Sequence, residues 1–392
     1  MTIKLYYEDP YIQTFSAKVI KQEQDYVVLS ETAFYPTGGG QPHDTGTLNN
    51  ISVTNIETIE GEIRHYLATN LPSDVGYVEG AIDWKRRFDH MQQHSGQHIL
   101  SAAFDNLFGL KTVSFHLGKD SSTIDIDTSE VSGEQLQQVE DLANQIILEN
   151  RTIETRWVTE EDLKDYKLRK ATKVKEDIRL VLIPDFDDNA CGGTHPRYTG
   201  QVGLIKILQT EKQKRMIRVE FVCGNRVISH LHRKQSIVSN LIQSLSSPEE
   251  KLEDAVKALL DNGKSFDKQM AYLKETLLQY EAKELIQNKQ GRNIASTFQD
   301  RTIQELQKLA KLVTSESEES ICILISENED LLQLVAAKGK AVEQSMKQLM
   351  ESILPLINGK GGGNETIAQG GGEKILSSEQ LLEKALTNIH SL

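Results

Sequence analysis

The chain of 392 residues contains only three cysteines, Cys191, Cys223 and Cys322. They are too few and too widely spaced for a disulfide framework, and they are typical of a reducing compartment. No run of about 18 apolar residues occurs, so the sequence predicts no membrane-spanning helix. The first residues, MTIKLYYEDP, fit neither a signal peptide nor a transit peptide. We therefore expect a cytoplasmic protein without a membrane partner.

Positive charge is outweighed by negative charge, since 57 acidic residues against 44 lysines and arginines give a formal net charge of −13. This balance argues against binding of nucleic acid over the whole surface. Local basic segments still occur, and residues 167–175 hold five basic side chains in nine positions. A solvated charged face is the ordinary interpretation of such a run, and a local nucleic-acid contact is the alternative.

Changes in the apolar pattern divide the chain into four predicted domains. With 38% hydrophobic residues, a chain of this length can bury at least two cores. Short alternating strands come first, and near Trp84 the pattern becomes that of a helix, with Gly109 as its expected end. The predicted fold class is α+β. The predicted domains are a small β-barrel (1–85), an α+β domain (86–235), a helical linker module (236–300) and a C-terminal α/β glycine-rich domain (301–392).

Local patterns give finer expectations. Ser132 with Gln135, and Ser247 with Glu250, have the spacing of helix capping boxes. The tract 359–372 holds seven glycines in fourteen positions and is predicted to form a tight loop in a folded domain. A heptad-like apolar stripe consists of Phe266, Met270, Leu273, Leu277 and Tyr280. This stripe predicts an antiparallel helix pair or, alternatively, a coiled coil.

His94 and His98 lie four residues apart in the helix predicted after Trp84. Residues i and i+4 share one helical face, so both imidazoles point toward the same place. This spacing is a common way to present two nitrogen ligands to zinc. The pair alone is equally typical of structural histidines, and residue 95 is a serine instead of the glutamate that metalloproteases use as a base.

The segment CGGTH supplies a second pair, Cys191 and His195. Its two glycines allow a tight turn, so that a thiolate and an imidazole can converge. The four residues together offer three imidazoles and one thiolate, a mixed ligand set that zinc accepts. We therefore predict one zinc ion per chain. Its role stays open between structural and catalytic, because four protein ligands would close the coordination sphere.

These motifs resemble the editing domain of alanyl-tRNA synthetase and of the stand-alone AlaX editing proteins, long type. The resemblance is carried, in chain order, by FYPTGGGQPHDTG (34–46), HSGQH (94–98), CGGTH (191–195), TGQVG (199–203) and RVEFVCG (218–224). The tail GKGGGNETIAQGGG (359–372) resembles the C-terminal domain shared by alanyl-tRNA synthetases and DHH phosphoesterases. No Asp-His-His triplet occurs, so phosphoesterase chemistry is not expected.

The resemblance implies a trans-editing hydrolase that deacylates mischarged seryl-tRNA(Ala), with glycyl-tRNA(Ala) left open as a second substrate. Its expected partner is tRNA(Ala) carrying serine. No class II aminoacylation domain is found in the sequence, so no aminoacylation activity is expected. Zinc would either polarise the ester or a water molecule, or hold the substrate's amino group, and the sequence leaves both roles open.

The resemblance also assigns pocket residues around the glycine-rich segment. Gly38, Gly39 and Gly40 offer backbone N–H groups that a substrate can approach closely. Thr37 is expected to hydrogen-bond the serine hydroxyl, and Gln41 is a second polar contact. A site built for a hydroxyl discriminates strongly against the analogue without it. From residue types alone, the same segment is also typical of a tight β-turn.

His116 marks a departure from the family pattern, which usually has a glutamine after the segment corresponding to TVS at residues 112–114. His116 is expected either to order water in the pocket or to be a surface histidine. Its presence leaves the substrate preference open.

Contacts to the RNA backbone are expected in two places by resemblance. Free backbone N–H groups and a lysine are suited to phosphate. The expected RNA-binding residues are Arg218, Lys360, Gly361, Gly362, Gly363 and Gln369.

The helices at 247–290 are expected to bridge the domains and to support a homodimer through the C-terminal region.

Two other functions remain open. Threonyl-type editing domains share both metal-binding spacings, but their second motif tends to have Cys-x-Gly-Pro-His, whereas this chain has Gly193 and Thr194 before His195. The non-enzymatic alternative is a tRNA-binding protein with a structural zinc.

Overall fold

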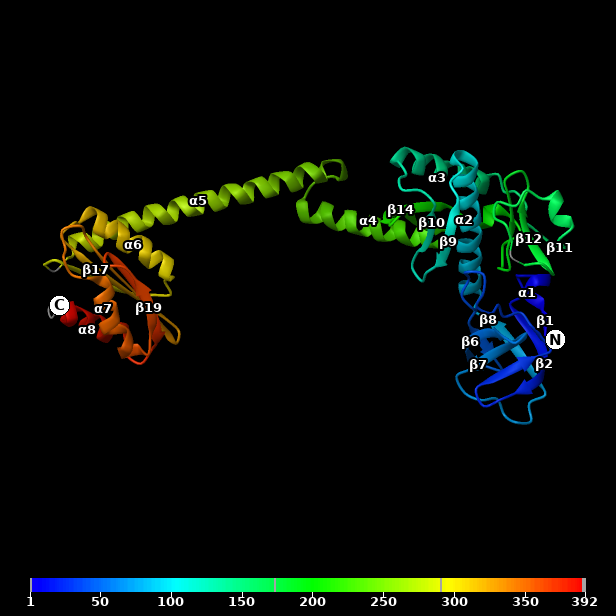
Figure 1. The fold of residues 1–392 in the computed structure, drawn as a ribbon, viewed down its shortest axis with the longest axis horizontal. Helices are drawn as coiled ribbons and strands as arrows, with labels where there is room; N and C mark the ends of the chain where they lie inside the picture. The colour runs from blue at the N-terminus through cyan, green and yellow to red at the C-terminus, as the bar shows by residue number, and fades with distance from the viewer. Residues whose placement is uncertain (1, 173, 290, 390–392) are drawn as a thin grey trace. The chain divides into compact units, whose positions relative to one another are not determined.

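The computed structural model describes residues 2–172, 174–289 and 291–389. The chain divides into two compact units, residues 1–241 and 242–392 (Figure 1). Lys173, which belongs to the basic segment 167–175, lies outside the described residues. Within the described residues, no helix combines the length and the apolar character that crossing a membrane requires.

The first unit begins with a closed barrel of six strands, as predicted. Burial alternates along its strands because successive side chains of a strand point to opposite faces. Phe34, Leu48 and Ile56 fill the interior. A short strand β1 (Ile3–Lys4) pairs with β4 (Glu31–Thr32) beside it, and α1 (Leu5–Glu8) follows β1. The barrel strands, in neighbour order, are β2 (Thr14–Gln22), β3 (Tyr26–Leu29), β7 (Glu62–Leu67), β6 (Ile51–Ile59), β5 (Gly46–Leu48) and β8 (Tyr77–Ile82).

Helix α2 (Trp84–Phe108) is the centre of the rest of this unit. The Asp83 carboxylate accepts the Arg86 backbone N–H at its start, and Gly109, in the left-handed conformation, ends it as predicted. Every residue from His90 to Phe104 is buried, because the helix is packed on several sides by β9, β13, β15 and α3. The polar residues of this stretch must therefore find partners inside the protein.

Two antiparallel sheets and α3 surround α2. The capping box predicted for Ser132 and Gln135 is formed at the start of α3 (Gly133–Leu148). A shared apolar core joins α2, α3 and the larger sheet. The sheets are β14 (Ile205–Gln213), β15 (Met216–Cys223), β10 (Ser122–Ile126) and β9 (Thr112–Leu117), and β11 (Glu154–Val158), β12 (Ile178–Ile183) and β13 (Asp187–Ala190).

The helical segment differs from its prediction. Helix α4 (Asn225–Leu245) runs across the predicted boundary at 235, and Ser247 caps no helix. Pro248 instead begins a 3-10 turn (Glu249–Lys251), which is followed by α5 (Leu252–Gln287). The stripe from Phe266 to Tyr280 is exposed along α5, so it forms no core of an antiparallel helix pair.

The second unit is a five-stranded sheet with helices on both faces (Figure 1). Alternate residues of β17 enter different cores: Cys322 packs with α5 and α6, whereas Ile323 packs with α7 and α8. In neighbour order the strands are β16 (Asn293–Gln299), β17 (Ile321–Asn328), β18 (Leu331–Lys338), β20 (Ile367–Glu373) and β19 (Lys360–Gly363). The helices are the end of α5, α6 (Ile303–Glu316), α7 (Met346–Ile353) and α8 (Ser378–Ile389).

Two predictions about this unit were wrong. The boundary after residue 300 would separate β16 from β17, with which it pairs in parallel. The glycine tract is no loop, because β19 and β20 form an antiparallel pair in which Gly361 lies opposite Gly370. A side chain at Gly361 would overlap the backbone of that partner strand, which explains glycine in a strand that otherwise disfavours it.

Candidate metal centre

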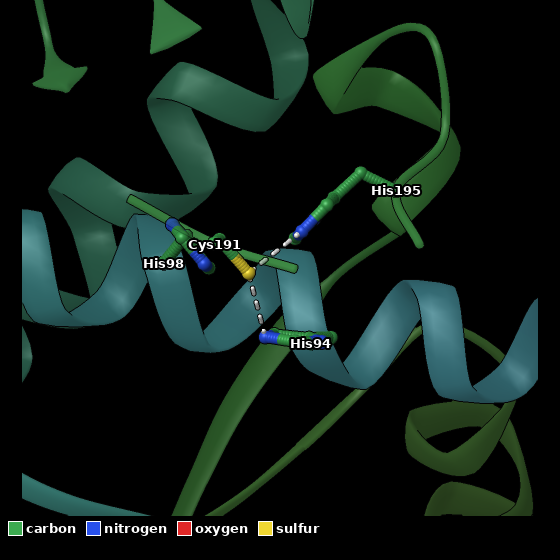
Figure 2. Close-up of side chains that lie close together, drawn as sticks. All are labelled: His94, His98, Cys191 and His195. Carbon is green, nitrogen blue, oxygen red and sulfur yellow. Dashed lines mark hydrogen bonds between the residues drawn. The ribbon is translucent and has the colours of Figure 1, made fainter. Parts of the chain in front are cut away.

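The four predicted ligands meet at one place (Figure 2). His94 and His98 come from one face of α2, and Cys191 and His195 from the loop that follows β13. All four ligand atoms lie within 4.8 Å of one another. Cys191 Sγ is 3.4 Å from His94 Nε2 and 3.3 Å from His195 Nε2. The three imidazoles are almost completely buried.

Each histidine is held by a protein partner at Nδ1. Gln41 Oε1 lies 3.0 Å from His94 Nδ1. Asp187 Oδ2 lies 3.2 Å from His98 Nδ1, and Ser95 Oγ lies 2.7 Å from His195 Nδ1. Such contacts fix the ring orientation and leave Nε2 for a metal.

Electrostatics inside the cluster favour a thiolate. Burial raises the pKa of Cys191, but the imidazoles of His94, His195 and His98 outweigh it and hold this pKa well below its ordinary value. Burial lowers the pKa of His98, yet Cys191 and Asp187 together raise it to about 9. The thiolate is the form in which cysteine binds metals.

The donor set fits zinc. A tetrahedral ion with bonds of about 2.0–2.3 Å places its ligand atoms roughly 3.5 Å apart. The Sγ–Nε2 distances of 3.3 and 3.4 Å are close to that spacing. Three neutral nitrogens and one thiolate are also ligands that this borderline-soft cation accepts. His94, His98, Cys191 and His195 could therefore hold one zinc ion.

The turn that carries Cys191 is built around two residues. A side chain at Gly193 would overlap the His94 imidazole, so the chain needs glycine there. Arg179 on β12 donates from one terminal nitrogen to the carbonyls of Cys191 (2.9 Å) and Gly193 (2.8 Å). Both contacts draw the turn onto the sheet and fix the direction of the thiolate.

A buried ion pair joins the glycine-rich loop to the histidine helix. Arg87 of α2 and Asp44 are both fully buried, and Arg87 Nε donates to both carboxylate oxygens at 2.9 and 3.0 Å. Asp44 also accepts the backbone N–H of Tyr35 at 2.6 Å. The barrel loop is thereby held at a fixed position relative to α2.

A cavity of about 320 Å³ opens beside the cluster. His94, His98 and Cys191 line it together with the backbone of Gly39. Phe115 lies at 5.4 Å from His94, ring centre to ring centre, and Lys170 adds a cation. The cavity thus combines three metal-ligand side chains, a glycine backbone and a positive charge.

Other predicted pocket residues lie outside this cavity. Gln41 is buried behind His94, where its amide also donates to Thr194 Oγ1 at 2.8 Å. Thr37 is exposed, and its hydroxyl lies 3.1 Å from His43 Nδ1. His116 is exposed on β9. Gly38 and Gly40 belong to the same loop as Gly39, but only Gly39 is among the residues that line the cavity.

The predicted RNA-binding residues are spread over both units. Arg218 pairs with Asp125 across the sheet at 2.8 Å and is 40% exposed at its side chain. Lys360 and the three glycines after it form the exposed edge strand β19. Gln369 lies opposite Gly362 on the neighbouring strand, with a buried Oε1 that has no hydrogen-bond partner among the described residues.

The residues that hold the ligands in place could not be predicted from the sequence. Asp187, Ser95 and Arg179 carry no motif of their own, and Asp187 lies 89 residues from His98 in the chain. Their only signal is position: Ser95 follows a ligand, and Asp187 opens the strand that precedes Cys191. Pairing between them and the ligands is a product of the tertiary fold.

Comparisons with known proteins place this centre in a class. The model of the threonyl and alanyl tRNA synthetase second additional domain matches residues 178–220, which include Cys191 and His195. The model of class II (A) tRNA synthetases matches residues 6–86, the barrel segment. Two of the four ligands therefore lie in a segment that matches a domain of these synthetases, whereas His94 and His98 lie outside both matched segments.

Full-length relatives define the family. The alanyl-tRNA editing protein AlaX-L of Pyrococcus horikoshii is 32% identical over 100% of this chain and 99% of its own length. The alanyl-tRNA editing protein Aarsd1 of Mus musculus is 32% identical over 89% of this chain and 85% of its own length. The chain belongs to the family of alanyl-tRNA editing proteins.

Longer relatives contain the same region. The alanine–tRNA ligase of Pyrococcus furiosus is 32% identical over 98% of this chain, which corresponds to 43% of the ligase. The chain thus spans less than half the length of the ligases that it matches.

Proposed function

We propose that this protein is a hydrolase that removes serine from mischarged tRNA(Ala), with one zinc ion at His94, His98, Cys191 and His195. The observation that carries the proposal is the cluster of four ligands, of which three are buried histidines; His94, His98 and Cys191 also line a cavity with Gly39. Membership in the alanyl-tRNA editing family supports the substrate class. Glycyl-tRNA(Ala) is a second substrate to be tested with the same assay.

The chain's own residues provide the setting for ester hydrolysis. Bound zinc would supply a Lewis acid for the ester or its attacking water, or a ligand for the substrate's amino group. Gly39 lets the ester approach the loop backbone closely, because no side chain stands in the way. Lys170 places a positive charge at the cavity, where negative charge develops on the ester oxygen during attack.

Selection of serine is proposed to depend on the glycine-rich loop. Thr37 remains our candidate for the hydroxyl contact, although it would have to exchange its bond with His43 for one with the substrate. Gln41 acts in this proposal by orienting His94 instead of by touching substrate. His116 is exposed on β9 and does not line the cavity, so it has no role in this proposal.

We further propose that the second unit binds the RNA and contributes to a homodimer. The exposed edge strand β19 offers Lys360 and glycine backbones to phosphates, and Gln369 lies on the adjacent strand. Arg218 would add a contact in the first unit. The exposed apolar stripe on α5, from Phe266 to Tyr280, supports self-association through this helix.

The alternatives make different predictions for the same proteins. Threonyl-type editing is favoured less, because the full-length relatives are named as alanyl-tRNA editing proteins. A non-catalytic tRNA-binding protein would carry the same zinc but would need no cavity at its ligands.

The test is the release of amino acid from seryl-tRNA(Ala), with alanyl-tRNA(Ala) as control, by the wild type and Cys191→Ala. We expect rapid release of serine alone, and a loss of at least about 100-fold in Cys191→Ala with circular dichroism unchanged. Cys322→Ala, which removes a thiol from the second unit, is the matched control and should keep full activity. Binding of tRNA without hydrolysis by the zinc-loaded wild type would favour the non-catalytic alternative.

A further inference from the structure

A second cavity, of about 520 Å³, adjoins the metal cluster. We call it the aromatic cavity; Tyr7 and Trp157 line it, together with Lys4 and Arg179. It shares four lining residues with the cavity described above: Thr172, Ala190, Cys191 and Gly192. A ligand that occupies both cavities would pass directly beside the Cys191–Gly192 turn.

Trp157 is placed to receive a flat ligand. It lies on β11, and 55% of it is exposed. Its ring packs edge-on against Tyr7, with 5.5 Å between ring centres and 77° between planes. The Tyr7 hydroxyl in turn donates to the Gly192 carbonyl at 2.9 Å. The aromatic pair is therefore anchored to the turn that carries the metal ligand.

Positive charge borders the same aromatic pair. The Arg179 guanidinium lies 4.8 Å from the centre of the Tyr7 ring, and the Lys4 ammonium lies 5.7 Å from it. Arg179 lines the cavity, and its Nε is buried and has no hydrogen-bond partner among the described residues. Exposed aromatic rings beside cations are the combination that binds unpaired nucleotides, through base stacking and phosphate contacts.

We propose that the aromatic cavity binds an unpaired nucleotide at the 3′ end of the RNA, with a base stacked on Trp157 while the aminoacyl ester occupies the cavity at the metal cluster. This inference rests on the proposed function for the identity of the RNA. Its physical basis is the shared wall, because Cys191 and Gly192 line both the cavity at the metal cluster and the cavity that holds Trp157. Trp157 would be a positioning residue that sets where the ester lies.

The first experiment reports on binding without requiring hydrolysis. The chain has two tryptophans, so Trp84→Phe leaves Trp157 as the only one. We expect saturable quenching of its fluorescence by the trinucleotide CCA, which has the unpaired sequence of a tRNA 3′ end. Adding Lys4→Gln to this background should weaken the binding, since it removes a cation from the wall.

The second experiment measures the consequence for editing. Trp157→Ala should lower kcat/KM for seryl-tRNA(Ala) about 5- to 100-fold, the range expected for loss of one stacked base. Trp157→Phe should restore most of it, because a ring remains. Tyr77→Ala removes an exposed aromatic from β8, outside both cavities, and should have no effect.

The outcomes separate this inference from the proposed function. If seryl-tRNA(Ala) is hydrolysed, but CCA leaves Trp157 fluorescence unchanged and Trp157→Ala is as active as the wild type, the inference is wrong and the proposed function stands. If CCA quenches Trp157 and no hydrolysis occurs, the aromatic cavity is a nucleotide site and the proposed hydrolase is wrong.

Discussion

At the scale of single residues, the metal centre depends on the side chains that contact the Nδ1 atoms of its histidine ligands. Gln41, Asp187 and Ser95 each contact one Nδ1, so the three imidazoles are presented with the same ring nitrogen toward Cys191. Among these three side chains Asp187 has the strongest electrostatic effect on its histidine, because it is a carboxylate buried beside an imidazole. Arg169 holds its other oxygen at 2.7 Å.

Asp187→Asn should weaken zinc binding about 10- to 100-fold, the usual effect of removing a partner behind a metal ligand. The substitution keeps the side-chain shape but removes the charge that makes His98 a better ligand. Zinc affinity would be measured by competition with a chromophoric chelator. Asp188→Asn, on the next position of β13, is the matched control and should change the affinity less than twofold. Equal affinities of Asp187→Asn and wild type would show that the contact is merely structural.

At the scale of elements, the site exists because three segments are locked together. The buried stretch of α2 brings two ligands, the turn after β13 brings two more, and the barrel loop reaches the cluster through Gln41. The Arg87–Asp44 pair fixes the loop to α2. Breaking a buried pair leaves an uncompensated charge, which costs far more than losing an exposed one.

Asp44→Asn should lower the free energy of unfolding of the first unit by about 3–5 kcal/mol, because Arg87 would stay buried without its counter-charge. Urea unfolding followed by circular dichroism measures this change. The control is Glu154→Gln, because its partner Arg156 is 56% exposed at its side chain. We expect this variant to lose less than about 1 kcal/mol in free energy of unfolding. A similar loss in both variants would contradict the argument.

At the scale of the whole molecule, the metal centre and the glycine-rich sheet belong to different units. The cores of the barrel and of α2 lie in residues 1–241, and both cores of the five-stranded sheet lie in residues 242–392. No described core cluster spans both units. Each unit should therefore unfold on its own.

Removing zinc with a chelator should lower the melting temperature of one calorimetric transition and leave a second unchanged. All four ligands lie in the first unit, and a ligand present at about 1,000 times its Kd stabilises by roughly 4 kcal/mol, equivalent to about 10 °C for a unit of this size. Scanning calorimetry before and after chelation, with zinc added back, provides the measurement. A single transition that shifts as a whole would mean that the units unfold together.

The sequence alone determined the features that depend on local spacing. His94 and His98 share a face because a helix repeats every 3.6 residues, and CGGTH turns because glycine permits it. The barrel, the extent of α2 and the cap at Ser132 were predicted from alternation, a stop at Gly109 and a capping box. Each of these signals lies within a few neighbouring residues.

Only the tertiary structure decided which distant residues meet. Asp187 contacts His98 and Gln41 contacts His94 because separate elements pack together, and nothing in their own segments encodes the pairing. The glycine tract became strands because β18 provides a neighbour with which β20 pairs, whereas its composition alone is typical of a loop. Trp157 lies beside Tyr7 and the metal turn for the same reason: folding brings together segments that chain distance keeps apart.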